Sequence, residues 1–152
     1  MSGFSKKEVL ALVPQQRPYR FIDEIHELNE DGIVASYTFK DDEFFYPAHF
    51  PGNPVTPGAV LLEAMAQAGV VAYGIYLCSL QMPREEIEKY TTVFTEANVE
   101  FTGIVKPGDK IIVKASKEYF RRMKMKAKAE VSLTDGKVVC SGTIAGMGIK
   151  TK

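Results

Sequence analysis

The spacing of hydrophobic and polar residues changes along the chain, and each spacing predicts an element. Ser5 stands three residues before Glu8, which is a capping-box pattern, and apolar residues continue to Pro14, so we expect a short first helix. Residues 21–28 and 33–40 flank an Asn-Glu-Asp-Gly turn, and the second segment alternates apolar and polar side chains. These two segments therefore predict a β-hairpin.

A proline-rich stretch follows the hairpin. Residues 47–58 hold four of the eight prolines of the chain. Because proline fixes φ and lacks an N–H donor, we expect this stretch to be a stiff loop. At its end, Thr56 as N-cap and Pro57 as first helical residue predict the start of a helix, with Gly58 near the second position.

The longest apolar segment, residues 59–78, predicts a buried helix. Glu63 and Gln67 are its only strongly polar side chains. A helix that is apolar on all sides lies in a protein core or crosses a membrane. The glutamate near its start and the absence of flanking Lys or Arg residues favour the core, and we expect no membrane span.

Strand patterns fill the rest of the chain. A charged connector at 84–90 precedes four strand candidates, at 91–103, 109–119, 122–133 and 137–147. The turns between these strands are short, which favours antiparallel neighbours. The element order predicts an α+β fold, with one antiparallel sheet wrapped around one long central helix, in a single domain over residues 1–152. Sheet edges and an incompletely covered helix favour a dimer.

Composition removes several classes of protein. Hydrophobic residues make up 45% and charged residues 25%, as in soluble globular proteins. The 19 basic residues balance 19 acidic ones, which disfavours nucleic-acid binding. The two cysteines and two histidines lack metal-ligand spacing, so we expect no metal site. The N-terminal lysines precede no apolar signal region, so a cytoplasmic location is expected.

The charges are unevenly distributed along the chain. Residues 21–43 hold eight acidic side chains and one basic one, whereas residues 114–128 hold seven basic side chains and one acidic one. The basic run fits a solvated strand face protected by lysines. It fits equally a docking surface for an acidic partner.

Three residues around the start of the long helix carry candidate chemistry. Glu63 is either a solvated carboxyl in the first helical turn or a desolvated one, hydrogen-bonded by Gln67 on the same face. His49, in the stiff loop, is either a general base or a surface residue. The N–H of Gly58 is either an oxyanion donor or a packing feature. As a set, base, acid and donor suit removal of a proton α to a carbonyl with loss of a β-leaving group.

The same segment resembles a known family. The run from His49 to Gly58, followed by Leu62-Glu63-Ala64-Met65-Ala66-Gln67, resembles the signature of the 3-hydroxyacyl-[acyl-carrier-protein] dehydratases of bacterial type II fatty acid synthesis. Weaker similarities extend the resemblance over residues 12–147. It implies the hot-dog fold, in obligate dimers that often assemble as trimers of dimers.

The resemblance also implies a role for each residue. His49 of one subunit and Glu63 of the other would line a shared tunnel for a phosphopantetheine-linked acyl chain. His49 would remove the C2 proton of a (3R)-3-hydroxyacyl thioester, and Glu63 would protonate the departing hydroxyl to give a trans-2-enoyl thioester. Gly58 would bind the thioester carbonyl, Gln67 would orient Glu63, and the Val55 carbonyl would fix the His49 tautomer. No metal or redox cofactor is implied.

The implied partner is an acyl carrier protein. Arg121, Arg122 and Lys124, in the basic run, are the expected docking residues. Ala48 and Gln15 depart from the usual Gly and His of the family, which hints at a divergent subgroup in polyene, pigment or another acyl pathway. Two alternatives stay open, a hot-dog acyl thioesterase and a non-catalytic subunit that binds acyl carriers.

Overall fold

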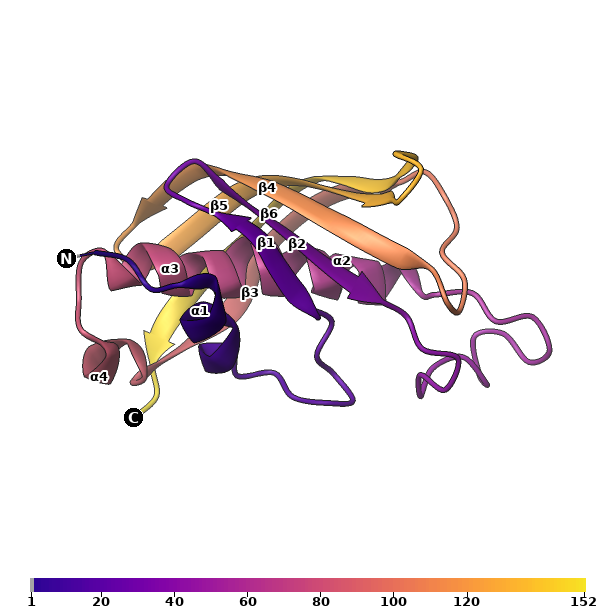
Figure 1. Cartoon of the computed structure of the whole chain (residues 1–152), viewed down its shortest axis with the longest axis horizontal. Coiled ribbons are helices and arrows are strands. Elements are labelled where there is room, and N and C mark those ends of the chain that lie inside the picture. The colour runs from indigo at the N-terminus through magenta and orange to yellow at the C-terminus, as the bar shows by residue number, and fades with distance from the viewer. Residues whose placement is uncertain (1) are drawn as a thin grey trace.

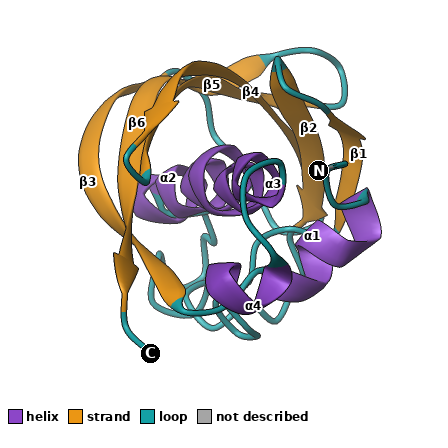
Figure 2. Cartoon of the chain, turned by 90° about the vertical axis from the view of Figure 1, so that its left-hand side faces the viewer, coloured by secondary structure: helices purple, strands orange, loops and turns teal. Residues whose placement is uncertain are grey.

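A six-stranded antiparallel sheet curls around one long helix in the computed structural model, which describes residues 2–152 (Figures 1 and 2). The strands are β1 (Glu24–Leu28), β2 (Gly32–Thr38), β3 (Tyr90–Phe101), β4 (Lys110–Arg121), β5 (Lys124–Leu133) and β6 (Val138–Lys150). The helices are α1 (Lys6–Leu12), α2 (Gly58–Ala66), the π-helical η1 (Gln67–Ala72), α3 (Tyr73–Ser79) and α4 (Arg84–Ile87). The expected α+β arrangement is confirmed.

The central helix is continuous from Gly58 to Ser79 through α2, η1 and α3. Figure 2 shows it enclosed by the curved sheet. Its length and mean hydropathy of 1.5 would suit a membrane span, but 78% of its most apolar window is buried inside the protein. Met65 and Tyr73 are fully buried, so this helix forms the middle of the core.

The start of the helix differs from the sequence prediction. Thr56 is not the N-cap, because its buried hydroxyl pairs with the Tyr46 hydroxyl at 2.6 Å instead of bonding a helical N–H. Pro57 takes the cap position, and Gly58 is the first helical residue. The Thr56 N–H donates to the Val105 carbonyl at 2.9 Å, which anchors the end of the stiff loop.

The place of β3 also corrects a prediction. The sheet order is β1-β2-β4-β5-β6-β3, so β3 pairs with β6 and not with β4, which follows it in the chain. The turn before β4 aligns with β2 instead: the Gly108 N–H donates to the Phe39 carbonyl, and the Phe39 N–H donates to the Asp109 carbonyl. The short connection after β3 therefore runs to the interior strand β4 past β5 and β6, and β3 becomes an edge strand.

The remaining local predictions are mostly confirmed. Ser5 caps α1 by accepting from the Glu8 N–H at 3.1 Å, and β1 and β2 form the expected hairpin. The expected alternation in β5 is present, because Met125 is buried and Lys128 is exposed. Two elements were not predicted: the helix α4, inside the charged connector, and the π-helical segment η1.

Candidate active site

Glu63 lies in the second turn of α2 and is partly buried. One of its carboxylate oxygens accepts a hydrogen bond from the Gln67 amide at 2.9 Å. Burial raises the pKa of Glu63 above its usual range, and the hydrogen bond from Gln67 opposes that rise. Of the two alternatives left open by the sequence, the structure favours the desolvated carboxyl. A carboxyl in this environment is suited to act as a general acid.

Gln67 holds Glu63 in place. Its side chain is fully buried and begins the π-helical segment η1, a type of distortion that is frequent at functional sites. Its amide donates to the Tyr19 carbonyl at 2.8 Å as well as to Glu63, and its oxygen accepts from the Phe21 N–H at 2.8 Å. The expected contact with Glu63 is confirmed. The two backbone partners ahead of β1 were not predicted.

His49 lies in the loop between β2 and α2. Its Nδ1 is 2.8 Å from the Val55 carbonyl oxygen, and the Val55 N–H donates to the His49 carbonyl, also at 2.8 Å. Because a carbonyl only accepts, Nδ1 carries the hydrogen and Nε2 is left as the basic nitrogen. The ring also stacks on Phe50, with the ring centroids 4.2 Å apart. The imidazole is thus fixed in one tautomer and one orientation.

Gly58 is positioned at the N-terminus of α2, where a helix leaves its first N–H groups without intrahelical partners. A Cβ at this position would lie 3.2 Å from the Phe101 ring of β3. The packing explanation for this glycine is therefore supported directly. Its N–H stays available for a ligand oxygen, so the donor role remains a prediction.

Glu63 and His49 do not line a common cavity within the described part of the chain. Glu63 borders a cavity of about 80 Å³ between the central helix, β3 and β6, and Gln15 is also part of its wall. In the sequence, Gln15 stands out only as a departure from the family pattern. His49 is in the loop that precedes the N-terminus of α2 and lies outside this cavity.

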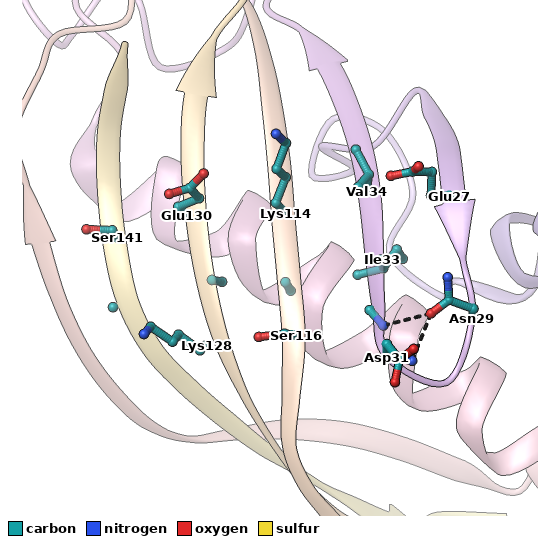
Figure 3. Close-up of a pocket in the computed structure, with 14 residues that line it drawn as sticks. Glu27, Asn29, Asp31, Ile33, Val34, Lys114, Ser116, Lys128, Glu130 and Ser141 are labelled. Atoms are coloured by element: carbon teal, nitrogen blue, oxygen red, sulfur yellow. Dashed lines mark hydrogen bonds between the residues drawn. The ribbon is translucent and has the colours of Figure 1, made fainter. Parts of the chain in front are cut away.

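A much larger hollow lies elsewhere. It has a volume of about 790 Å³ and is lined by residues of β1, β2, β4, β5 and β6 and of the turn between β1 and β2. Figure 3 shows the side chains of Lys114, Lys128 and Glu130 on the side of the sheet that faces away from the helix. None of the predicted catalytic residues borders it. Residues 2–152 contain no group of three or more His, Cys, Asp or Glu that could hold a metal ion.

The expected docking residues lie at the hairpin between β4 and β5. Arg122 is in the turn with a φ of 50°, and the Arg121 guanidinium lies 5.1 Å from the centre of the Tyr119 ring. Lys124 forms an ion pair with Glu96 at 2.9 Å, whereas the two arginines form no ion pair within residues 2–152. In Figure 1 this hairpin and the loop between β2 and α2 lie at opposite ends of the molecule. β4, whose 12 residues span about 40 Å along the strand, runs between these two ends.

Comparisons with known proteins agree with these features. Residues 13–143 match the family model of the FabA-like domain. A curated relative, the 3-hydroxyacyl-[acyl-carrier-protein] dehydratase FabZ of Caldicellulosiruptor bescii, is 34% identical over 139 residues, covering 90% of this chain and 93% of the relative. FabZ of Lactobacillus helveticus is 32% identical over 147 residues, covering 95% and 93%.

Solved structures with similar folds include dehydratases and thioesterases. The dehydratase heterocomplex ApeI:P from Xenorhabdus doucetiae superimposes with a TM-score of 0.74 at 16% identity, covering 93% of this chain and 91% of that one. Thioesterase HI1161 from Haemophilus influenzae gives a TM-score of 0.67 at 19% identity, covering 99% and 96%. At these identities the structures establish the hot-dog fold and nothing about the reaction.

Proposed function

The chain belongs to the FabA-like family of 3-hydroxyacyl-[acyl-carrier-protein] dehydratases, and from that premise we propose that His49 is its general base and Glu63 its general acid. The protein is a hydro-lyase that dehydrates 3-hydroxyacyl-[acyl-carrier-protein] in fatty acid biosynthesis. Two observations on protonation carry the assignment of roles. The Val55 carbonyl leaves Nε2 of His49 free to take a proton, whereas burial favours a proton on Glu63.

The reaction follows from these two protonation states. Nε2 of His49 takes the proton on C2 of a (3R)-3-hydroxyacyl thioester, and the electron pair of that C–H bond forms the C2–C3 double bond as the C3–O bond breaks. Glu63 gives its proton to the departing hydroxyl, which leaves as water beside a trans-2-enoyl thioester. The Gly58 N–H, at the positive end of α2, stabilises the charge that develops on the thioester oxygen.

We propose that the site is completed between two copies of the chain. Twelve-residue β3 is an edge strand, and its Val93, Phe94 and Phe101 side chains are 39%, 45% and 48% exposed. An unpaired strand edge with exposed apolar side chains is a surface that another strand covers. A homodimer would cover this edge and bring His49 of one copy to Glu63 of the other. A trimer of such dimers is a further expectation.

The substrate is carried by an acyl carrier protein, and we propose that its phosphopantetheine arm delivers the acyl chain without any metal or redox cofactor. The elimination involves no net oxidation or reduction, and the two proton transfers that accompany loss of water can be carried by His49 and Glu63. We propose Arg121 and Arg122 as the main contacts for the acidic carrier, with a smaller part for Lys124 because Glu96 already pairs with it. The proposed location is the cytoplasm.

The carrier contact is tested by charge reversal. Replacing Arg121→Glu and Arg122→Glu together should raise KM for the carrier-linked substrate and leave KM for a small thioester analogue unchanged. Lys137→Glu, at the exposed turn between β5 and β6, is the control and should change neither value. An equal rise in KM for both substrates would show that these arginines are not part of the docking surface.

The assignment of roles is tested with a 3-hydroxyacyl thioester and the absorbance of the enoyl product. Wild type should eliminate water, and His49→Ala and Glu63→Gln should each lower kcat by about 10²–10⁴-fold. If both variants keep wild-type rates, the assignment is wrong. Release of free thiol without elimination would support the thioesterase alternative, and tight carrier binding without turnover would support the non-catalytic subunit.

A further inference from the structure

Glu43 is a buried carboxylate that the reaction does not use. It is 8% exposed and lies in the loop between β2 and α2, a short distance before His49 in the chain. One of its oxygens accepts two hydrogen bonds, from the Tyr37 hydroxyl and from the Lys40 N–H at 3.0 Å. A buried carboxylate is costly unless it is hydrogen-bonded, and bonds to an ionised acceptor are stronger than neutral ones. These two bonds therefore attach the loop firmly to β2.

Tyr37 gives Glu43 a fixed point in the sheet. It is 3% exposed, and β2 is paired on both sides, with β1 and with β4. Its ring makes edge-to-face contacts with Phe21 and Phe39, at centroid separations of 5.6 and 5.0 Å. Burial and the neighbouring Glu43 raise the pKa of Tyr37, so the hydroxyl keeps its proton and stays the donor of this bond.

Two successive turns of the backbone connect Glu43 to His49. The Tyr46 N–H donates to the Glu43 carbonyl at 3.2 Å, and the His49 N–H donates to the Phe45 carbonyl at 2.9 Å. Phe45 is buried and packs against Phe39, with the ring centroids 6.3 Å apart. Because both turns are hydrogen-bonded, the position of Glu43 determines the position of the His49 backbone.

The loop is attached to the rest of the protein on both sides of His49. After His49, the Thr56 N–H donates to the Val105 carbonyl at 2.9 Å, and before it, Glu43 makes the attachment. The bond to the Val55 carbonyl orients the ring of His49, but Val55 belongs to the same loop and moves with it. A displacement of about 1 Å in a catalytic group can lower the rate about 10²-fold. The attachment before His49 therefore bears on catalysis.

We propose, on the basis of the dehydratase site above, that Glu43 is a positioning residue, whose bond to Tyr37 holds His49 where Nε2 reaches C2 of the substrate. In this role Glu43 acts through His49 and does not touch the substrate. Its loss should lower kcat, which depends on the place of the base, and leave KM nearly unchanged. Both bonds need an acceptor at this position and not a charge, so glutamine should preserve most of the function.

The first test measures kcat and KM with a 3-hydroxyacyl thioester, at a temperature where circular dichroism shows each variant to be folded. Glu43→Ala should lower kcat at least tenfold with KM within threefold of wild type, and Glu43→Gln should keep kcat within threefold. Asp42→Ala is the matched control, because Asp42 is the exposed acid next in the chain, and it should behave as wild type. Unchanged kcat in folded Glu43→Ala would overturn the proposal.

A second test separates positioning from a general structural role. In the His49→Ala background there is no base to position, so adding Glu43→Ala should change the residual elimination rate less than twofold. A structural role would lower that rate by the same factor as in wild type, and this result would overturn the proposal. If Glu43→Ala does not fold, Tyr37→Phe takes its place in both tests with the same expected directions, because it removes the donor and keeps the ring. Wild-type activity of His49→Ala alone would instead overturn the dehydratase site on which the proposal rests.

Discussion

Replacing Gln67 with leucine is the most informative single perturbation of this site. The change removes three hydrogen bonds at nearly constant volume: one from the Phe21 N–H, one to the Tyr19 carbonyl and one to Glu63. Gln67 is fully buried, so the leucine itself fits an apolar environment. The effects on stability and on catalysis can therefore be assigned to the lost hydrogen bonds.

The expected loss of stability follows from the burial of each partner. Phe21 is 1% exposed, so its unpaired N–H should cost about 1–3 kcal/mol. Tyr19 is 46% exposed and Glu63 is partly buried, so solvent can replace their bonds at about 1 kcal/mol each. The total is about 3–5 kcal/mol. For a domain of this length it corresponds to a fall in Tm of about 6–20 °C.

Gln67→Leu should also change the pH dependence of kcat. If Glu63 is the general acid, as proposed, kcat should fall as the pH rises through the pKa of Glu63. The hydrogen bond from Gln67 lowers that pKa against the effect of burial. Without it the pKa should be higher, and the alkaline fall of kcat should move to higher pH.

Chemical denaturation and a pH profile of kcat measure both effects. Gln81→Leu is the control, because Gln81 is exposed after the end of α3 and its loss should change stability by less than about 0.5 kcal/mol. A loss below about 1 kcal/mol for Gln67→Leu would refute the reasoning on stability. A move of the alkaline fall to lower pH would refute the role of Gln67 beside Glu63.

Three further predictions concern other parts of the molecule. Glu63→Gln should raise Tm relative to wild type more at pH 8 than at pH 4. The reason is that the folded-state pKa of Glu63 is raised, so wild type loses stability as the pH rises above the pKa of the unfolded state, about 4.3. An equal difference in Tm at both pH values would contradict this. Tyr46→Phe should lower the free energy of unfolding by about 1–3 kcal/mol in a denaturant titration, because it leaves the Thr56 hydroxyl unpaired. Adding Thr56→Val should recover part of that loss, whereas strictly additive losses would argue against a hydrogen bond between the two residues. Val93→Lys, on the exposed edge of β3, should give an inactive monomer in sizing chromatography, and an active monomer would disprove a site shared between subunits.

Local patterns in the sequence predict much of the fold. Ser5 and its following apolar residues place α1, the Gly-containing turn at 29–32 places the first hairpin, and the apolar run at 59–78 places the central helix. The contact between Glu63 and Gln67 is also local, because residues four apart share one face of a helix. These features need no knowledge of distant segments.

Features that depend on distant segments were missed or wrong. Thr56 has the residue type and position of an N-cap, but Tyr46 takes its hydroxyl. The turn at 105–109 has hairpin chemistry, but its hydrogen bonds go to Phe39 and leave β3 to pair elsewhere. Gln67 contacts the backbone of residues 19 and 21, and backbone groups carry no signature in the sequence. Tertiary pairing overrides local propensity in each case.

The position of β6 between β5 and β3 has a consequence for folding. β6 ends at Lys150, so β3 has no partner until almost the whole chain has been synthesised. Until then its apolar side chains are unpaired, a state in which nascent chains aggregate. Pairings between segments so far apart in sequence also slow folding. A chain that stops before Val138 would leave two strand edges open, at β5 and at β3, so premature termination should yield insoluble protein.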